Sequence, residues 1–259
     1  MARAQQEVSP PHRLGFLETL RKDRWWLEPA LVFLGLSLFF GWLTVSAFLD
    51  GWEFEIGPYL SPVYEPKLYG AFDAFWFSPA LLIVWIPAGF RMTCYYYRGA
   101  YYRSYFLSPP ACGVGDVSKS YAGESRFPLI LQNAHRFFMY GALIFVILLW
   151  RGAILGFHDP DEGWGIGLGS IFLVLNAFLL MMYTFSCHSL RHLVGGGLNC
   201  FSCSVWTRGR KRVWDYVTRW NENHRSWAWI SLVGVLATDL YIRLVANGQI
   251  TDPNTWSGF

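Results

Sequence analysis

The stretch GWGIGLGSIFLVLNAFLLMMYTFSCHSL, residues 163–190, decides the fold class. It contains no Asp, Glu, Lys or Arg. A helix needs roughly 20 consecutive apolar residues to cross the hydrocarbon core of a bilayer. This run exceeds that length, so it predicts a transmembrane helix rather than a helix in the core of a soluble domain.

Four other stretches have the same character, and their few charged side chains are Arg91, Arg136, Asp239 and Arg243. Asp239 and Arg243 are four residues apart, so we expect them to pair on one helix face. The sequence therefore predicts an all-α integral membrane protein, one membrane-anchor domain over residues 1–259. It would have an N-terminal segment at 1–28 and five transmembrane helices at about 30–49, 74–97, 127–150, 163–190 and 226–246.

The composition agrees with a membrane protein. Hydrophobic residues make up 53% and charged residues 15%, against roughly 25% charged in soluble domains. A net charge of +3 is too small to indicate nucleic-acid binding, and five cysteines do not form a secreted disulfide scaffold. The polar N-terminus, with no cleavage site after the first apolar run, argues against a signal peptide.

The loops predict the orientation. The N-terminal segment and the loops at 98–126 and 191–225 hold 16 Lys and Arg, whereas the loops at 50–73 and 151–162 and the C-terminal tail hold two. Lys and Arg near helix ends favour the cytoplasmic side. We therefore expect a multi-pass membrane protein with a cytoplasmic N-terminus and a C-terminus outside.

Cysteines and histidines gather near the cytoplasmic ends of the predicted helices. The candidates are Cys94, His135, Cys187, His188, His192 and His224. Polar residues inside a membrane are costly and by default face a functional path. Two imidazoles would suit a b-type haem, and two thiolates with two imidazoles would suit a Rieske-type [2Fe–2S] centre. The CxxC at 200–203 is a weaker indication of a zinc site.

Three motifs resemble a known family. They are RMTCYYYRGAYY at 91–102, FPLILQNAHR at 127–136 and SCHSLRHL at 186–193. Together they resemble the membrane-anchor subunit of succinate dehydrogenase, SdhC, in its five-helix actinobacterial form. Haem-containing anchors carry a haem-ligand His seven residues before the His of the Arg-His-Leu element, and that position is Phe185 here. The single-haem pattern is therefore not carried over.

The resemblance implies a complex with a flavoprotein subunit and an iron–sulfur subunit, both docked on the cytoplasmic face. The expected function is a subunit of succinate dehydrogenase, not catalytic alone, that carries electrons to a quinone in the lipid. From residue type and depth we predict a Rieske-type [2Fe–2S] centre held by Cys94, His135, Cys187 and His224, with His188 and His192 as alternates. The residues expected to bind quinone are Arg91, Tyr96, Arg136 and Trp229.

Two other functions remain open from the residues alone. One is a haem b anchor with His135 and either His188 or His192 as axial ligands. The other is a non-redox anchor or transporter, in which the cysteines and histidines only pack. Transporters often show a repeat and broken helices near the midplane, and neither is evident in the sequence.

Overall fold

The computed structural model describes residues 15–48, 54–67, 80–117, 123–127 and 129–256. The helices are α1 (Leu27–Phe48), α2 (Ala80–Thr93), α3 (Tyr95–Ser104), η1 (Gly123–Ser125), η2 (Leu129–Ala134), α4 (His135–Leu155), α5 (Leu168–Phe185), α6 (His188–Gly195), α7 (Val205–Glu222) and α8 (His224–Ala246). Two short antiparallel hairpins pair β1 (Glu55–Ile56) with β2 (Tyr59–Leu60), and β3 (His158–Asp159) with β4 (Gly163–Trp164).

The described part of the chain has four helical segments long and apolar enough to cross a membrane. They are Leu27–Ala47, Leu129–Leu155, Leu168–Phe185 and His224–Ala246. The fifth expected span is represented by α2, which has only 14 residues, and residues 74–79 of that prediction lie outside the described ranges. The all-helical prediction is confirmed, whereas the count of five spans and the orientation of the termini remain predictions.

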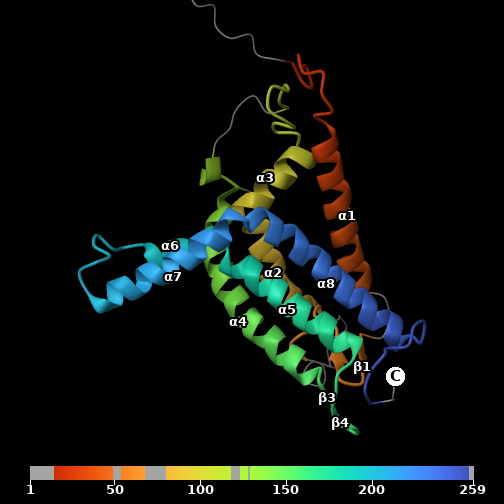
Figure 1. The fold of residues 1–259 in the computed structure, drawn as a ribbon. Helices are drawn as coiled ribbons and strands as arrows, with labels where there is room; N and C mark the ends of the chain where they lie inside the picture. The colour runs from red at the N-terminus through yellow and green to blue at the C-terminus, as the bar shows by residue number, and fades with distance from the viewer. Residues whose placement is uncertain (1–14, 49–53, 68–79, 118–122, 128, 257–259) are drawn as a thin grey trace, which may run out of the picture.

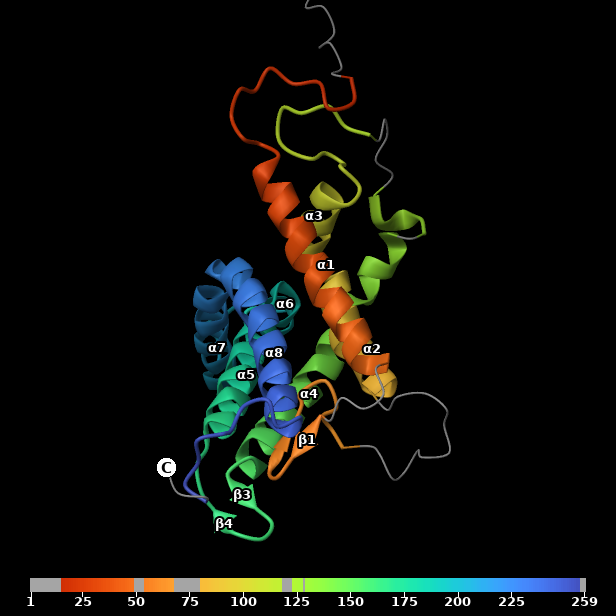
Figure 2. The ribbon, with the colours of Figure 1, turned by 90° about the vertical axis from the view of Figure 1, so that its right-hand side faces the viewer.

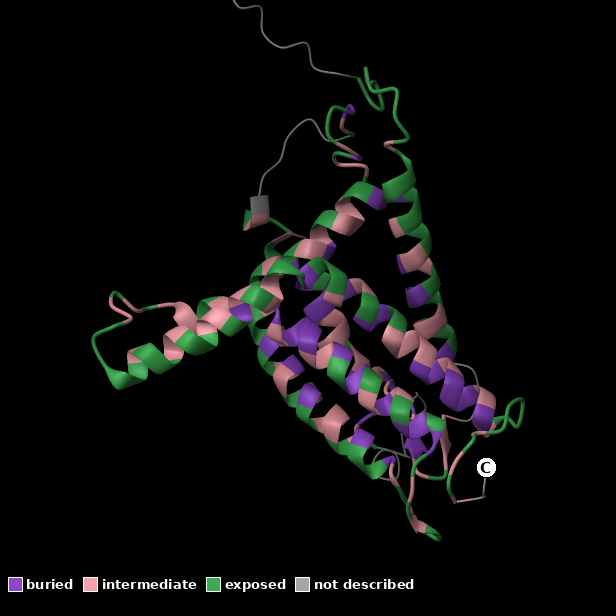
Figure 3. Ribbon diagram, viewed as in Figure 1, coloured by how far each residue is buried: buried purple, intermediate pink, exposed green. Residues whose placement is uncertain are grey.

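Helices α4, α5 and α8 form the centre of the bundle, with α2 packed against α4 (Figures 1 and 2). The buried residues concentrate along the faces where these helices meet, while α7 and much of α1 are exposed (Figure 3). Helix α1 lies to one side and contacts α3 more than α8. The bundle thus offers a buried interior, and α6 with α7 project away from it.

The predicted helices at 74–97 and 163–190 are each interrupted near their ends. The helix predicted at 74–97 divides into α2 and α3 at Cys94, and the helix predicted at 163–190 divides into α5 and α6 at Cys187. An apolar run predicts how long a segment can stay in the membrane, but it does not show where the backbone turns. The predicted helix at 127–150 likewise begins as the 3₁₀ helix η2 and becomes α-helical only at His135.

The segment predicted as a cytoplasmic loop at 191–225 is largely helical, since it contains most of α6 and the whole of α7. Helix α7 begins at a capping box in which Ser204 and Thr207 exchange hydrogen bonds. The structure describes residues 54–67 of the loop at 50–73, and they contain the β1–β2 hairpin, which packs on α8. Residues 50–53 and 68–73 lie outside the described ranges.

Candidate functional site

Cys94 and Cys187 occupy equivalent places in the backbone. Each is the N-cap of a short helix that follows an apolar helix, with φ −62° and ψ 131° at Cys94 and φ −66° and ψ 138° at Cys187. Both thiols are free and buried. Cys187 Sγ accepts a hydrogen bond from the Ser189 N–H at 3.3 Å. Burial raises the pKa of both thiols, and the backbone N–H groups at the start of each short helix oppose that shift.

Each cysteine faces a histidine from another helix. Cys94 Sγ lies 3.5 Å from Nε2 of His224, the first residue of α8. Cys187 Sγ lies 3.1 Å from Nε2 of His135, the first residue of α4. All four residues line one hollow. The structure therefore brings together the four side chains that the sequence analysis selected from four different helices.

The far nitrogen of each imidazole is held by a hydroxyl group. Thr93 Oγ1 lies 3.0 Å from His135 Nδ1, and Ser186 Oγ lies 2.8 Å from His224 Nδ1. These contacts turn both Nε2 atoms toward the sulfurs, which is the role of outer-shell partners in metal sites. The sequence analysis missed both hydroxyls. Each directly precedes a cysteine, so the repeated hydroxyl–cysteine dipeptide was the available signal.

An aromatic ring stacks on each imidazole. Phe90 lies against His135 with ring centroids 4.9 Å apart, and Tyr183 lies against His224 at 5.2 Å. Each aromatic residue is four positions before a cysteine, one helical turn along α2 or α5. Both rings are almost completely buried. Each ring therefore covers one face of an imidazole.

The two alternate histidines behave differently. The His188 ring lies 5.8 Å from the His224 ring and lines the same hollow. Burial lowers the pKa of His188, and the nearby Arg191 cation lowers it further, so its imidazole stays neutral at pH 7. His192 instead places Nδ1 2.9 Å from Arg136 Nη2. His188 is thus near the cluster, whereas His192 points to another part of the surface.

The zinc alternative at the CxxC is wrong for this structure, because Cys200 and Cys203 form a disulfide and hold no thiolate for a metal. Among the described residues, no three His, Cys, Asp or Glu side chains surround a point where a single metal ion could bind. The Cys–His cluster consists of two pairs and is not such a group. A mononuclear site with three or more of these ligands therefore has no support in the described chain.

Arg91 is the one predicted quinone-binding residue that lines the interior cavity described below. It is buried, and Nη1 donates to Tyr97 Oη at 2.6 Å while Nη2 donates to Ser231 Oγ at 3.0 Å. Its guanidinium carbon lies 4.6 Å from the centre of the Tyr183 ring. Within the described ranges no carboxylate pairs with Arg91. A buried cation without a carboxylate partner favours an electron-rich ligand beside it.

The other three predicted quinone residues lie elsewhere. Trp229 Nε1 donates to Tyr96 Oη at 2.5 Å, and Tyr96 lines a polar cleft together with Glu28 and His188. Arg136 is exposed and contacts His192. The structure therefore separates the four residues into three places.

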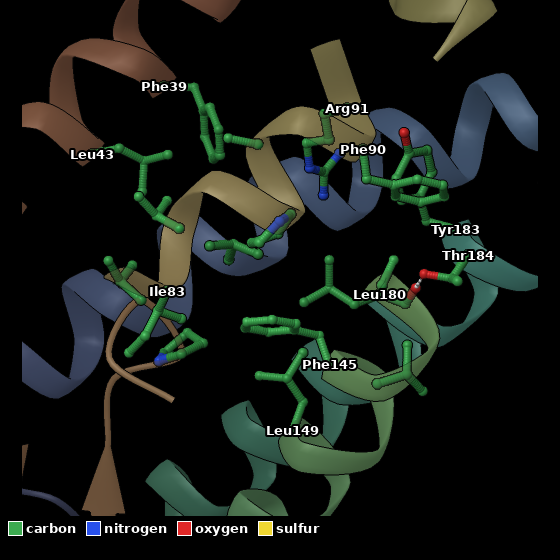
Figure 4. Close-up of a pocket in the computed structure, with 18 of the residues that line it drawn as sticks. Phe39, Leu43, Ile83, Phe90, Arg91, Phe145, Leu149, Leu180, Tyr183 and Thr184 are labelled. Carbon is green, nitrogen blue, oxygen red and sulfur yellow. Dashed lines mark hydrogen bonds between the residues drawn. The ribbon is translucent and has the colours of Figure 1, made fainter. Parts of the chain in front are cut away.

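An apolar cavity lies on the other side of the two stacked rings (Figure 4). Phe90 and Tyr183, which stack on the histidines, also line this cavity. Its remaining walls come from α1, α2, α4, α5 and α8, with Phe39, Leu43 and Phe145 among them, and Arg91 lies at its edge (Figure 4). These two rings thus contact the histidines of the Cys–His hollow and also line the apolar cavity.

The profile of the family "Actinobacterial succinate dehydrogenase subunit SdhC" matches residues 27–248. The chain belongs to this family. It is therefore the SdhC membrane subunit of a succinate dehydrogenase, a multi-pass protein of the bacterial cell membrane. The resemblance carried by the three motifs is confirmed.

A solved structure supports the same assignment for the SdhC fold. The chain is similar to a chain of the Mycobacterium smegmatis Sdh1 complex in the apo form, with 41% sequence identity and a TM-score of 0.83. The match covers 94% of this chain and 96% of that chain. No curated protein sequence matches the chain. As a subunit of such a complex it works with other succinate dehydrogenase subunits and with quinone, and it is not catalytic alone.

Proposed function

We propose that this SdhC subunit carries electrons from the iron–sulfur subunit to quinone through a Rieske-type [2Fe–2S] centre. The residues that would hold it are Cys94, His135, Cys187 and His224. The observation that carries the proposal is the pairing of two buried thiols with two imidazole Nε2 atoms in one hollow. His188, beside His224, remains an alternate ligand.

The donor set fits such a centre. A Rieske-type [2Fe–2S] centre takes two thiolates on one iron and two imidazoles on the other. Each iron needs only two protein ligands, so the residues need not form a three-ligand group around one point. When bound, the centre would accept and release one electron at a time. Thr93 and Ser186 hold the imidazoles in the required orientation, and the rings of Phe90 and Tyr183 exclude water from them.

The apolar cavity is the proposed place for the quinone ring. Its lining is almost wholly apolar, and Arg91 supplies a positive charge at its edge. Such a lining suits a hydrophobic ring, and a few placed polar groups fix its orientation. Because Phe90 and Tyr183 line this cavity and also stack on His135 and His224, a quinone ring bound there would lie close to the Cys–His cluster. Among the predicted quinone residues the proposal uses Arg91, because Tyr96, Trp229 and Arg136 lie outside this cavity.

The water-soluble subunits are proposed to dock on the cytoplasmic face, where the N-terminal segment and the loop at 98–126 carry basic residues. The hollow that contains the Cys–His cluster is lined in part by Arg98 of α3 and Glu124 of η1. An ion pair joins these two side chains at its rim. Electrons from an iron–sulfur subunit seated there would reach the cluster before the quinone.

The proposal is tested with the double variant H135A/H224A in the intact complex. Removing both imidazoles should abolish succinate-dependent quinone reduction. Succinate oxidation measured with an artificial dye should persist, because the dye takes electrons from the water-soluble subunits. The matched control is H158A, which removes an exposed histidine of the β3–β4 hairpin and should leave both activities unchanged. Normal quinone turnover in H135A/H224A would refute the ligand assignment.

Low-temperature electron paramagnetic resonance separates the cluster from a haem. A rhombic signal that appears on reduction, with a low average g, supports the imidazole-ligated [2Fe–2S] centre. The signal should be lost in C94S and retained in C112S, since Cys112 is an exposed free cysteine away from the hollow. A low-spin ferric signal in the oxidised complex, lost on reduction, would instead favour haem b bound by His135 and His188.

A further inference from the structure

The α6–α7 arm, residues 188–222, lies outside the helical bundle. It projects to one side, crosswise to α4, α5 and α8 (Figure 1). The arm directly joins α5 to α8, and both are segments that can cross the membrane. Because it connects the ends of two spans while running across them, the arm must lie at the membrane surface on the face where α5 ends and α8 begins.

The arm is a fixed hairpin. The Arg210 side chain of α7 donates to the carbonyl oxygens of Val194 at 2.8 Å and Gly196 at 2.9 Å, at the end of α6. Arg191 Nε of α6 donates to Thr218 Oγ1 of α7 at 2.9 Å. These bonds cross-link the two helices at both ends, so one side of α7 is always turned toward α6.

A second side of α7 carries an apolar row that the described chain leaves exposed except at Trp220, which stacks on Phe185. The row consists of Val205, Trp206, Gly209, Val213, Tyr216 and Trp220, which fall within one side of the helix at 100° per residue. Trp206 is 75% exposed and Val205 78% exposed. Leu193 and Val194 of α6 continue the row across a shallow groove between the helices. In water such a row would be costly for the protein.

A basic row runs along α7 beside the apolar one. Arg208, Arg212 and Arg219 are spaced i, i+4 and i+11, which places them on one side of the helix, and all three are exposed. Their long apolar stems can cover hydrocarbon while the guanidinium groups stay in the headgroup region. An apolar row bordered by Arg and Lys is typical of helices that lie in a membrane interface.

We propose that the α6–α7 arm lies flat on the bilayer, with its apolar row in the acyl boundary and its basic row on anionic lipid headgroups. The exposed apolar row suits the acyl boundary, and the positive row complements negative headgroups. The arm would thereby fix the membrane depth of Cys187 and His224, which flank it. This proposal does not depend on the identity of the redox centre.

Spin labels at three exposed positions of α7 test the proposal in the full complex, reconstituted in nanodiscs that contain phosphatidylglycerol. The labelled variants are W206C and V213C in the apolar row and R212C in the basic row, in a background with C112S, C200S and C203S. The background protein without an added cysteine is treated with the same label, and its signal measures any reaction of the buried Cys94 and Cys187. We expect the ratio of oxygen to nickel-chelate accessibility to be several-fold higher at positions 206 and 213 than at 212.

Two results would overturn membrane contact. Nickel accessibility at 206 and 213 as high as at 212 would place the arm in water. Protection of 206 and 213 from both oxygen and nickel would show that protein, such as another subunit, covers the row. Replacing phosphatidylglycerol with phosphatidylcholine should make the label at 206 shallower, and an unchanged depth would refute the headgroup contact.

Discussion

Asp239 and Arg243 on α8 form an ion pair that is completely buried. Arg243 Nε lies 3.1 Å from each Asp239 carboxylate oxygen. The pairing predicted from their four-residue spacing is confirmed. The sequence did not show the other donors to Asp239, which include Trp42 of α1 at 2.7 Å and Ser61 of the 54–67 segment. Such contacts join residues almost 200 positions apart, and no local pattern encodes them.

Removing one partner of this pair should be costly. We expect R243M and D239L each to lower the free energy of unfolding by about 3 kcal/mol or more, because each leaves a buried charge uncompensated. The double variant R243M/D239L should lose less free energy of unfolding than the sum of the two single losses. Unfolding in mixed detergent and denaturant micelles measures all three. The matched control is R225M on the same helix, whose exposed pair with Glu28 should contribute at most about 1 kcal/mol. Strict additivity would contradict the coupling.

Glu65 is a buried carboxyl group in the segment that packs on the bundle. Burial raises the pKa of Glu65, and Arg151 opposes the shift from 3.9 Å. At a pH between the unfolded and the folded pKa of Glu65, the folded state therefore holds a proton that the unfolded chain has already released. Stability falls as the pH rises from the unfolded pKa through the raised folded value, and the loss is complete above it.

The variant E65Q should remove this pH dependence. At pH 7.5 we expect it to be more stable than the unmodified protein by roughly 1 kcal/mol, since a buried carboxylate oxygen without a hydrogen-bond partner is lost. The advantage should disappear toward pH 4, where Glu65 is protonated in both states. Thermal unfolding across this pH range is the measurement, with E162Q, an exposed carboxyl group of the β3–β4 turn, as control. An advantage that grows at low pH would contradict the assigned direction.

The identity of the four Cys–His residues was accessible to sequence reasoning because their type and depth are unusual in membrane helices. The residues that contact these four side chains could not be identified from the sequence. Phe90 and Tyr183 looked like ordinary apolar positions, and Thr93 and Ser186 like ordinary hydroxyl residues. Their roles follow from the turns at Cys94 and Cys187, and these turns were not expected within uninterrupted apolar runs.

At the scale of elements, α2 and α4 approach closely at two glycines. A Cβ built at Gly141 would lie 2.6 Å from Ile86 Cγ2, and one at Gly89 would lie 2.3 Å from the Phe138 ring. Each glycine thus admits a side chain from the opposite helix. Because α2 leads into Cys94 and α4 begins at His135, this contact sets the spacing of the two sides of the hollow.

The variant G141A should force α2 and α4 apart. We expect it to lower the free energy of unfolding by about 1–3 kcal/mol, the usual cost of overpacking. Quinone reduction should fall more than dye reduction, since the Cys–His spacing changes while the water-soluble subunits do not. The control is G41A on α1, where a Cβ would meet nothing within 4 Å. Equal effects of the two substitutions would show that close packing is not the cause.

The sequence predicted the apolar helices well but not the amphipathic ones. Long apolar runs with few charges identify α1, α4, α5 and α8 because the bilayer imposes a minimum length. Helix α7 contains four Lys and Arg within its first half and was expected to be part of a loop. Its helical spacing of Trp206, Val213 and Tyr216 was present in the sequence, as was the Ser204 cap. A search restricted to long apolar runs could not detect it.

At the scale of the whole molecule, Asp252 joins three distant parts of the chain at one end of the bundle. It accepts hydrogen bonds from Tyr59 Oη at 2.8 Å, Tyr241 Oη at 2.5 Å and the Gly169 N–H at 2.9 Å. Burial beside this carboxylate raises the pKa of Tyr59 strongly, so its hydroxyl stays protonated and remains a donor. The C-terminal tail, the β1–β2 hairpin and the start of α5 are thereby held together.

The variant D252A should loosen this end of the molecule without affecting the other. Three donors lose their acceptor, and each buried group left unpaired should lower the free energy of unfolding by about 1–3 kcal/mol. Hydrogen exchange should increase in residues 54–60 and 249–256, and residues 90–98 around Cys94 should be unchanged. The exposed Asp161 gives the control D161A. Faster exchange throughout the bundle would indicate global destabilisation.

The Asp239–Arg243 pair also bears on how the chain enters the membrane during synthesis. A charge at the centre of a helix adds about 2.5–3.5 kcal/mol to its insertion. The cost is smaller for Asp239 and Arg243, which lie toward the C-terminal end of α8. Because both charges lie on α8 one turn apart, they can neutralise each other inside a single helix, before any neighbour is in contact. Helix α8 can thus be integrated as an independent segment. The donors from α1 and from the 54–67 segment then select its final position during assembly of the bundle.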